Sequence, residues 1–102
     1  PHAPVQVMLK TVALKDMMTS KIEAFLDRRE IRDAYDIEFL VKRGIVLNAD
    51  HEVITQMLTK LGKLGKKDFS VKLGSLLDVS ERKYYVENGF RILEANLRDK
   101  LR

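Results

Sequence analysis

Cysteine is absent from this sequence of 102 residues, and proline and glycine are scarce, with two and five copies. Without thiols the chain can form neither disulfides nor thiolate metal sites, which excludes thiol redox chemistry and agrees with a reducing cytosol. So few turn-forming residues favour helices over a turn-rich all-β fold. No apolar run approaches the roughly 18 residues that a membrane span needs, and no signal-peptide core is evident. We therefore expect a cytoplasmic protein that does not contact a membrane.

The size and net charge of the chain further limit its domain count and its possible functions. A chain of 102 residues suits one small domain and is short for an enzyme with its own nucleotide pocket. The net charge of +4, from 19 basic and 15 acidic residues, gives only weak attraction to polyanions. Because the chain begins with Pro1 instead of methionine, we expect a fragment of a longer two-part protein.

The spacing of apolar residues predicts a mainly α fold. In residues 5–12, Val5, Val7 and Leu9 alternate with Gln6, Met8 and Lys10, which predicts a short strand that needs a partner sheet or a second copy of the chain. Helical periodicity then covers residues 14–28 and 31–42, the latter ending before Gly44. We expect a strand and lead-in over residues 1–13 and a small bundle of about four helices over residues 14–102, together forming a single domain.

The second half of the chain supplies the other two helices. Asn48 or Asp50 can cap a third helix with a regular apolar stripe to Leu64, and a fourth runs from about residue 78 to the end. Asn88 and Gly89 are a break signal in that last helix. Residues 68–77 fit both a strand and a helical period, so we predict only an apolar anchoring segment there.

A lysine and two carboxylates stand among apolar helix positions. Lys21 shares a helix face with apolar neighbours, while Asp33 and Asp36 are three residues apart on the next helix, beside Arg32. Two carboxylates this close repel unless a cation neutralises them, and Lys21 can do so if the helices pack antiparallel. The spacing alone leaves two interpretations open: a wet surface network with Arg28 and neighbouring cations, or a functional site.

These residues resemble the motifs of a known family. Lys21-x-x-Ala24, followed by Arg32-Asp33-x-Tyr35-Asp36-Ile37-x-Phe39-Leu40, is similar to the carboxyl-terminal motifs of the AbiEii/AbiGii nucleotidyltransferase-like toxins, within the polymerase-β-like nucleotidyltransferase superfamily. The resemblance implies that Lys21 contacts nucleotide phosphate and is catalytic together with Asp36, while Arg32 and Asp33 hold the local geometry. It covers residues 5–44; beyond them only general helical character is shared.

The same resemblance implies a function for the parent protein. Such a toxin transfers a nucleoside monophosphate from an NTP to an RNA or protein hydroxyl with Mg²⁺, within a toxin–antitoxin or phage-defence system, and is counteracted by an antitoxin protein. In this family the Gly-Ser and acidic motifs that bind the metal precede the late motifs, but Gly74-Ser75, the only such pair here, follows them. We therefore expect no metal site in this chain alone, and no transfer by it.

The alternative is a self-sufficient helical module that binds nucleic acid or a protein partner. Lysines between residues 60 and 72 offer contacts for phosphates, although no aromatic residues alternate with them, and the unpaired strand offers an edge for a homo-oligomer. His51 lies between Asp50 and Glu52, but adjacent helical residues point apart, so an exposed histidine is expected. The enzyme hypothesis requires Lys21 and Asp36 to face each other beside a hollow.

Overall fold

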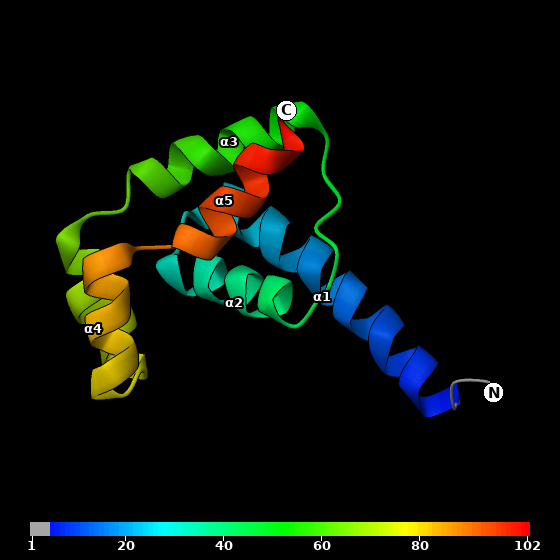
Figure 1. Cartoon of the computed structure of the whole chain (residues 1–102), viewed down its shortest axis with the longest axis horizontal. Coiled ribbons are helices and arrows are strands. Elements are labelled where there is room, and N and C mark those ends of the chain that lie inside the picture. Colours follow the sequence, from blue (N-terminus) through cyan, green and yellow to red (C-terminus); the bar gives the residue numbers. More distant parts are fainter. Residues whose placement is uncertain (1–4) are drawn as a thin grey trace.

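The computed structural model describes the backbone of residues 5–102 and the side chains of residues 13–102. Five α-helices follow one another within the described residues (Figure 1): α1 (Val5–Arg28), α2 (Ile31–Lys42), α3 (His51–Gly62), α4 (Val79–Asn88) and α5 (Arg91–Lys100). A π-helical turn, η1 (Asp68–Leu73), and a 3₁₀ turn, η2 (Gly74–Leu76), connect α3 to α4. The prediction of a mainly α fold is confirmed. No helix in residues 5–102 combines the length and the apolar character that crossing a membrane requires.

The strand predicted for residues 5–12 is wrong. These residues begin α1, which continues without a break to Arg28, and its first half extends away from the other helices (Figure 1). A helix satisfies its backbone hydrogen bonds within the segment, whereas a lone strand leaves them unpaired. Good helix formers such as Met8, Leu9 and Lys10 support the same outcome. Homo-oligomer formation through an unpaired strand therefore loses its basis.

The helix ends follow the capping signals closely. Asp50 caps α3 by accepting a hydrogen bond from the Val53 N–H at 2.9 Å, and Asp78 caps α4 in the same way from the Glu81 N–H at 2.8 Å. Gly89, with a φ of 63°, separates α4 from α5. The predicted count of about four helices is therefore one too low, because the break signal divides the last helix in two.

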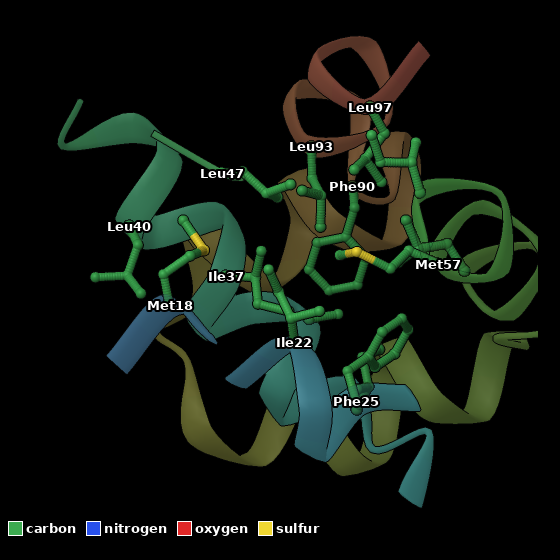
Figure 2. Close-up of a cluster of buried hydrophobic side chains, with 14 of the residues drawn as sticks. Met18, Ile22, Phe25, Ile37, Leu40, Leu47, Met57, Phe90, Leu93 and Leu97 are labelled. Atoms are coloured by element: carbon green, nitrogen blue, oxygen red, sulfur yellow. The ribbon is translucent and has the colours of Figure 1, made fainter. Parts of the chain in front are cut away.

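All five helices contribute to one hydrophobic core (Figure 2). The segment predicted only as an apolar anchor belongs to it: Leu73 is fully buried, and the Phe69 ring lies 5.4 Å from the Phe90 ring. The buried apolar side chains are Met18, Ile22, Phe25, Ile31, Ala34, Ile37, Leu40, Leu47, Ile54, Met57, Leu61, Leu73, Tyr85, Phe90, Leu93 and Leu97.

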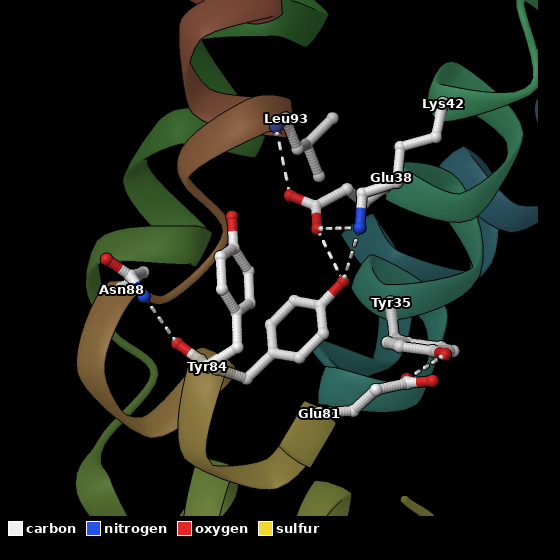
Figure 3. A network of polar contacts seen from close by, with 8 residues as sticks. Tyr35, Glu38, Lys42, Glu81, Tyr84, Asn88 and Leu93 are labelled. Atoms are coloured by element: carbon white, nitrogen blue, oxygen red, sulfur yellow. Dashed lines mark hydrogen bonds and ion pairs between the residues drawn. The ribbon is translucent and has the colours of Figure 1, made fainter.

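A buried carboxylate connects α2 to the last two helices (Figure 3). Glu38 is fully buried, and its Oε2 accepts a hydrogen bond from the Leu93 N–H at 3.0 Å while its Oε1 accepts one from the Tyr85 hydroxyl at 2.6 Å. Lys42 Nζ lies 3.6 Å from Oε1 and balances the charge. Leu93 lies in the first turn of α5, where Phe90 has no side-chain acceptor to offer, so Glu38 caps α5 from another helix.

We predict that Glu38→Ala lowers the free energy of unfolding by about 3 kcal/mol, because the Leu93 N–H and the Tyr85 hydroxyl lose their acceptor inside the protein. Glu38→Gln keeps an acceptor oxygen and should lose less. Urea denaturation followed by circular dichroism measures both changes. A loss below about 0.5 kcal/mol for the alanine variant, the size of an ordinary surface substitution, would contradict the structural role of Glu38.

Candidate functional site

The tight connection between α1 and α2 places Lys21 opposite the two aspartates of α2. Only Arg29 and Glu30 separate the helices, and Arg29 has a φ of 53°, a left-handed conformation that ends α1 and turns the chain back. Lys21 Nζ lies 2.8 Å from Asp36 Oδ2 and 3.6 Å from Asp33 Oδ1. The antiparallel packing thus brings together the three charged residues that the spacing singled out.

The two aspartates have different environments. Asp33 is buried, with 3% of its surface exposed, and Arg28 Nη2 donates to both of its carboxylate oxygens at 3.2 and 3.4 Å. Asp33 also lies in the first turn of α2, where the helix dipole favours a negative charge. Asp36 and Lys21 each keep about a third of their side chain exposed, 33% and 30%. Asp33 therefore holds the helices together, and the Lys21–Asp36 pair faces solvent.

Arg28 belongs to the cluster although the site prediction did not include it. Sequence reasoning placed it only in the alternative surface network. Its position seven residues after Lys21 puts it two turns further along the same face of α1, and that spacing is the signal that identifies it. The structure therefore contains parts of both interpretations, the local ion network and the functional site. Arg28, from the network, and Lys21, from the site, both contact the buried Asp33.

An open hollow of about 300 Å³ lies beside this cluster and is lined by Lys21, Arg28, Glu30, Arg32 and Asp33. Its three cationic side chains outnumber its two acidic ones. Arg32, predicted to hold local geometry, is exposed at this border. Because an ammonium group carries three N–H donors, Lys21 can remain bonded to Asp36 and still donate to an anion in the hollow. The arrangement is suited to binding a phosphate group.

The pKa of Lys21 is raised above its usual value of 10.5. The hydrogen bond to Asp36 is the largest cause; partial desolvation opposes it, and the negative charges of Asp36 and Asp33 add to it. Lys21 is therefore protonated at neutral pH. It can attract an anion or polarise a phosphoryl oxygen, but it does not serve as a proton-accepting base.

The aspartates of this cluster do not form a magnesium site. Cationic side chains contact both carboxylates, whereas Mg²⁺ requires several oxygen ligands in octahedral geometry. Among the side chains of residues 13–102, no group of three histidine, cysteine, aspartate or glutamate residues is placed to hold a metal ion. The cluster therefore does not fit the metal that the family resemblance implies.

The remaining candidates from the sequence lie elsewhere. His51 is exposed at the start of α3. Gly74 and Ser75 lie in η2, where Gly74 is buried and its carbonyl accepts a hydrogen bond from Arg82 Nε at 3.1 Å. These contacts give Gly74 a structural role.

A family model described as "Nucleotidyl transferase AbiEii toxin, Type IV TA system" matches residues 2–99 of the chain. The chain belongs to this AbiEii family. The resemblance noted in α1 and α2 is confirmed, and the match extends over α3, α4 and most of α5. The family's description also associates it with a type IV toxin–antitoxin system, in which a toxin has an antitoxin counterpart. No curated protein and no solved structure gives a significant match.

We predict that Asp36→Asn lowers the pKa of Lys21 toward 10.5 by more than Asp33→Asn does, because the hydrogen bond to Asp36 is the largest cause of the raised value. Since folding raises this pKa, the stability that the interaction contributes is fully present below pH 10.5 and is lost as the pH rises through the folded-state value. NMR titration of the Lys21 side chain measures the shift. A larger fall in the Asp33 variant would contradict the assignment.

Proposed function

We propose that this chain supplies the late half of a nucleotidyltransferase site. The reaction transfers a nucleoside monophosphate from an NTP to a hydroxyl of RNA or protein, as the toxin of a system with an antitoxin. The observation that carries the proposal is the partly exposed Lys21–Asp36 pair, 2.8 Å apart, at the edge of a cationic hollow. Nucleotidyl transfer requires fixed positive charge on the phosphates, and Lys21 is protonated and positioned to provide it.

The residues divide the task between them. Lys21 contacts a phosphate oxygen of the nucleotide, and the exposed Arg28 and Arg32 extend the cationic border of the hollow. Asp36 orients the Lys21 ammonium group and, since a carboxylate accepts several hydrogen bonds, can also accept one from a substrate group. Asp33, buried between Lys21 and Arg28, keeps α1 and α2 in register.

Mg²⁺ and the NTP are part of this proposal, but the metal needs other ligands. Because Asp33 and Asp36 are neutralised by cations, we propose that the carboxylates that hold the metal lie outside residues 13–102. The isolated 102-residue chain is then expected to be inactive in transfer. In this proposal Lys21, Asp33 and Asp36 do not bind the metal.

The pairing of Lys21 with Asp36 also bears on the alternative of a binding module. Asp36 contacts a lysine of the neighbouring helix beside a hollow, which is the geometry that the enzyme hypothesis requires. A module that bound nucleic acid only through the lysines between residues 60 and 72 would not require Lys21 and Asp36 to face each other. The enzyme is therefore the function that we favour.

We predict that Lys21→Ala and Asp36→Ala in the native gene product each reduce transfer of labelled nucleotide by about 100-fold or more, the order expected when a preorganised electrostatic contact is lost. The melting temperature should change little, because an ion pair that is one-third exposed contributes at most about 1 kcal/mol and the buried Asp33 keeps Arg28. Radiolabelled NTP transfer and thermal denaturation measure the two effects.

Lys15→Ala and Asp16→Ala are matched controls for that experiment. Both residues are exposed on α1, two turns or less before Lys21, and both substitutions remove the same charges without touching the cluster. Transfer should remain at the wild-type rate in each. Activity retained by Lys21→Ala or Asp36→Ala would exclude that residue from the site.

A further inference from the structure

The ion pair between Arg28 and Asp33 spans the connection between α1 and α2. Arg28 is the last residue of α1, and Asp33 lies in the first turn of α2. Arg28 Nη2 donates to both carboxylate oxygens of Asp33, at 3.2 and 3.4 Å. The side chain of Arg28 is 58% exposed, whereas that of Asp33 is 4% exposed. A cation at the surface thus compensates a negative charge in the interior.

Lys21 is shared unequally between two carboxylates. Its Nζ lies 2.8 Å from Asp36 Oδ2 but 3.6 Å from Asp33 Oδ1, which is longer than a normal N–H···O hydrogen bond. Burial alone would favour the opposite arrangement, because an uncompensated carboxylate is more costly inside a protein than at its surface. Arg28 accounts for the observed one: it compensates Asp33 and leaves Lys21 to the partly exposed Asp36.

The charges around the hollow are balanced, so the loss of one cation changes their sum. Three cationic and two acidic side chains line the hollow, and Asp36, bonded to Lys21, adds a third negative charge. Without Arg28 this group would have one net negative charge, and Lys21 would be the remaining ion-pair partner of the buried Asp33. An ammonium group that balances two carboxylates attracts a phosphate less strongly.

We propose that Arg28 is a positioning residue for the phosphate contact of Lys21. By neutralising Asp33, it keeps the Lys21 ammonium group on Asp36 and available to an incoming anion. Arg28 then acts on the substrate through Asp33 and Lys21, and this role does not require its own contact with a phosphate. The importance of the arrangement for catalysis rests on the proposed function, whereas the choice of partner by Lys21 does not.

The choice of partner by Lys21 can be tested without a measurement of activity. In the Arg28→Met variant of the native gene product, we expect Lys21 to move toward Asp33. In that background Asp33→Asn should lower the pKa of Lys21 more than Asp36→Asn does, which reverses the order expected in the wild-type protein. NMR titration of the Lys21 side chain measures both changes. An order that stays as in the wild type would overturn the proposal.

Transfer of labelled nucleotide tests whether this pairing matters for the site. We expect Arg28→Met to reduce transfer by about 100-fold, the loss that a displacement of a catalytic group by about 1 Å can cause. Adding Asp33→Asn removes the buried charge that attracts Lys21 and should restore most of the lost transfer. If the double variant stays as slow as Arg28→Met, or if Arg28→Met transfers at the wild-type rate, the proposal is wrong.

Arg32→Met is the matched control for charge. Arg32 is an exposed cation of the same hollow, whereas the ion pairs of Asp33 are with Lys21 and Arg28. The substitution therefore removes the same charge and leaves the buried pair intact. The order of the two pKa effects should stay as in the wild type, and Asp33→Asn should not restore transfer that Arg32→Met loses. A reversed order here would overturn the proposal, because net charge alone would then direct Lys21.

Two further variants decide the question if circular dichroism shows that the uncompensated Asp33 unfolds Arg28→Met. Arg28→Lys keeps a cation beside Asp33, so the order of the pKa effects should remain that of the wild type, and a reversal would contradict the proposal. Arg28→Met with Asp33→Asn has no buried charge at this position and should fold and transfer nucleotide faster than Lys21→Ala. A folded double variant as inactive as Lys21→Ala would overturn the positioning role.

The two measurements also separate this proposal from the proposed function. If the wild-type protein transfers no nucleotide, the proposed function fails, and the order of the pKa effects still decides which partner Arg28 leaves to Lys21. If that order does not reverse in Arg28→Met while Lys21→Ala abolishes transfer, the positioning role fails and the proposed function stands.

Discussion

The two-residue connection between α1 and α2 is the constraint on which the site depends. It leaves the chain room only to reverse directly, and the reversal requires Arg29 to adopt a left-handed conformation that costs a non-glycine residue about 1 kcal/mol. The buried pairing of Asp33 with Arg28 and Lys21 offsets that cost. A longer connection would free α2 to slide or rotate on α1, and Asp36 would no longer meet Lys21. The geometry of the proposed phosphate contact is thus fixed by a connection of only two residues.

Helix α2 carries two buried carboxylates with opposite orientations. Asp33 contacts α1, whereas Glu38 contacts α4 and α5 through Tyr85 and Leu93. A buried charge is costly unless partners surround it, so each carboxylate fixes the helices that supply its partners. One helix thereby fixes α1 on one side relative to α4 and α5 on the other.

The sequence predicts the cluster well because its partners are close along the chain. Periodicity places Lys21 on one helix and Asp33 and Asp36 on the next, and a short connection allows antiparallel packing. Glu38 could not be foreseen, because its partners Tyr85 and Leu93 are 47 and 55 residues away. Local spacing contains no information about such distant contacts.

The wrong strand over residues 5–12 and the undecided segment over residues 68–77 both have local causes. Alternation over residues 5–12 is too short to distinguish a strand from a helix when each residue type tolerates both. Periodicity does not distinguish a strand from an α-helix over residues 68–77, because this segment has neither regular period and forms π-helical and 3₁₀ turns. The break at Gly89 was foreseeable, since a glycine after asparagine is a strong local signal that needs no tertiary information.

Asp33 is buried and Asp36 is partly exposed, and this difference explains how the cluster can bind a substrate without loss of stability. If both aspartates were buried, a phosphate that drew Lys21 away would leave a carboxylate uncompensated in the interior, at a cost of several kcal/mol. Asp36 is instead one-third exposed, so water also solvates it while Lys21 stays bonded to it and donates a further N–H to the substrate. Asp33 keeps Arg28 throughout. In the proposed reaction Lys21 can therefore bind a second anion while the packing of α1 on α2 remains intact.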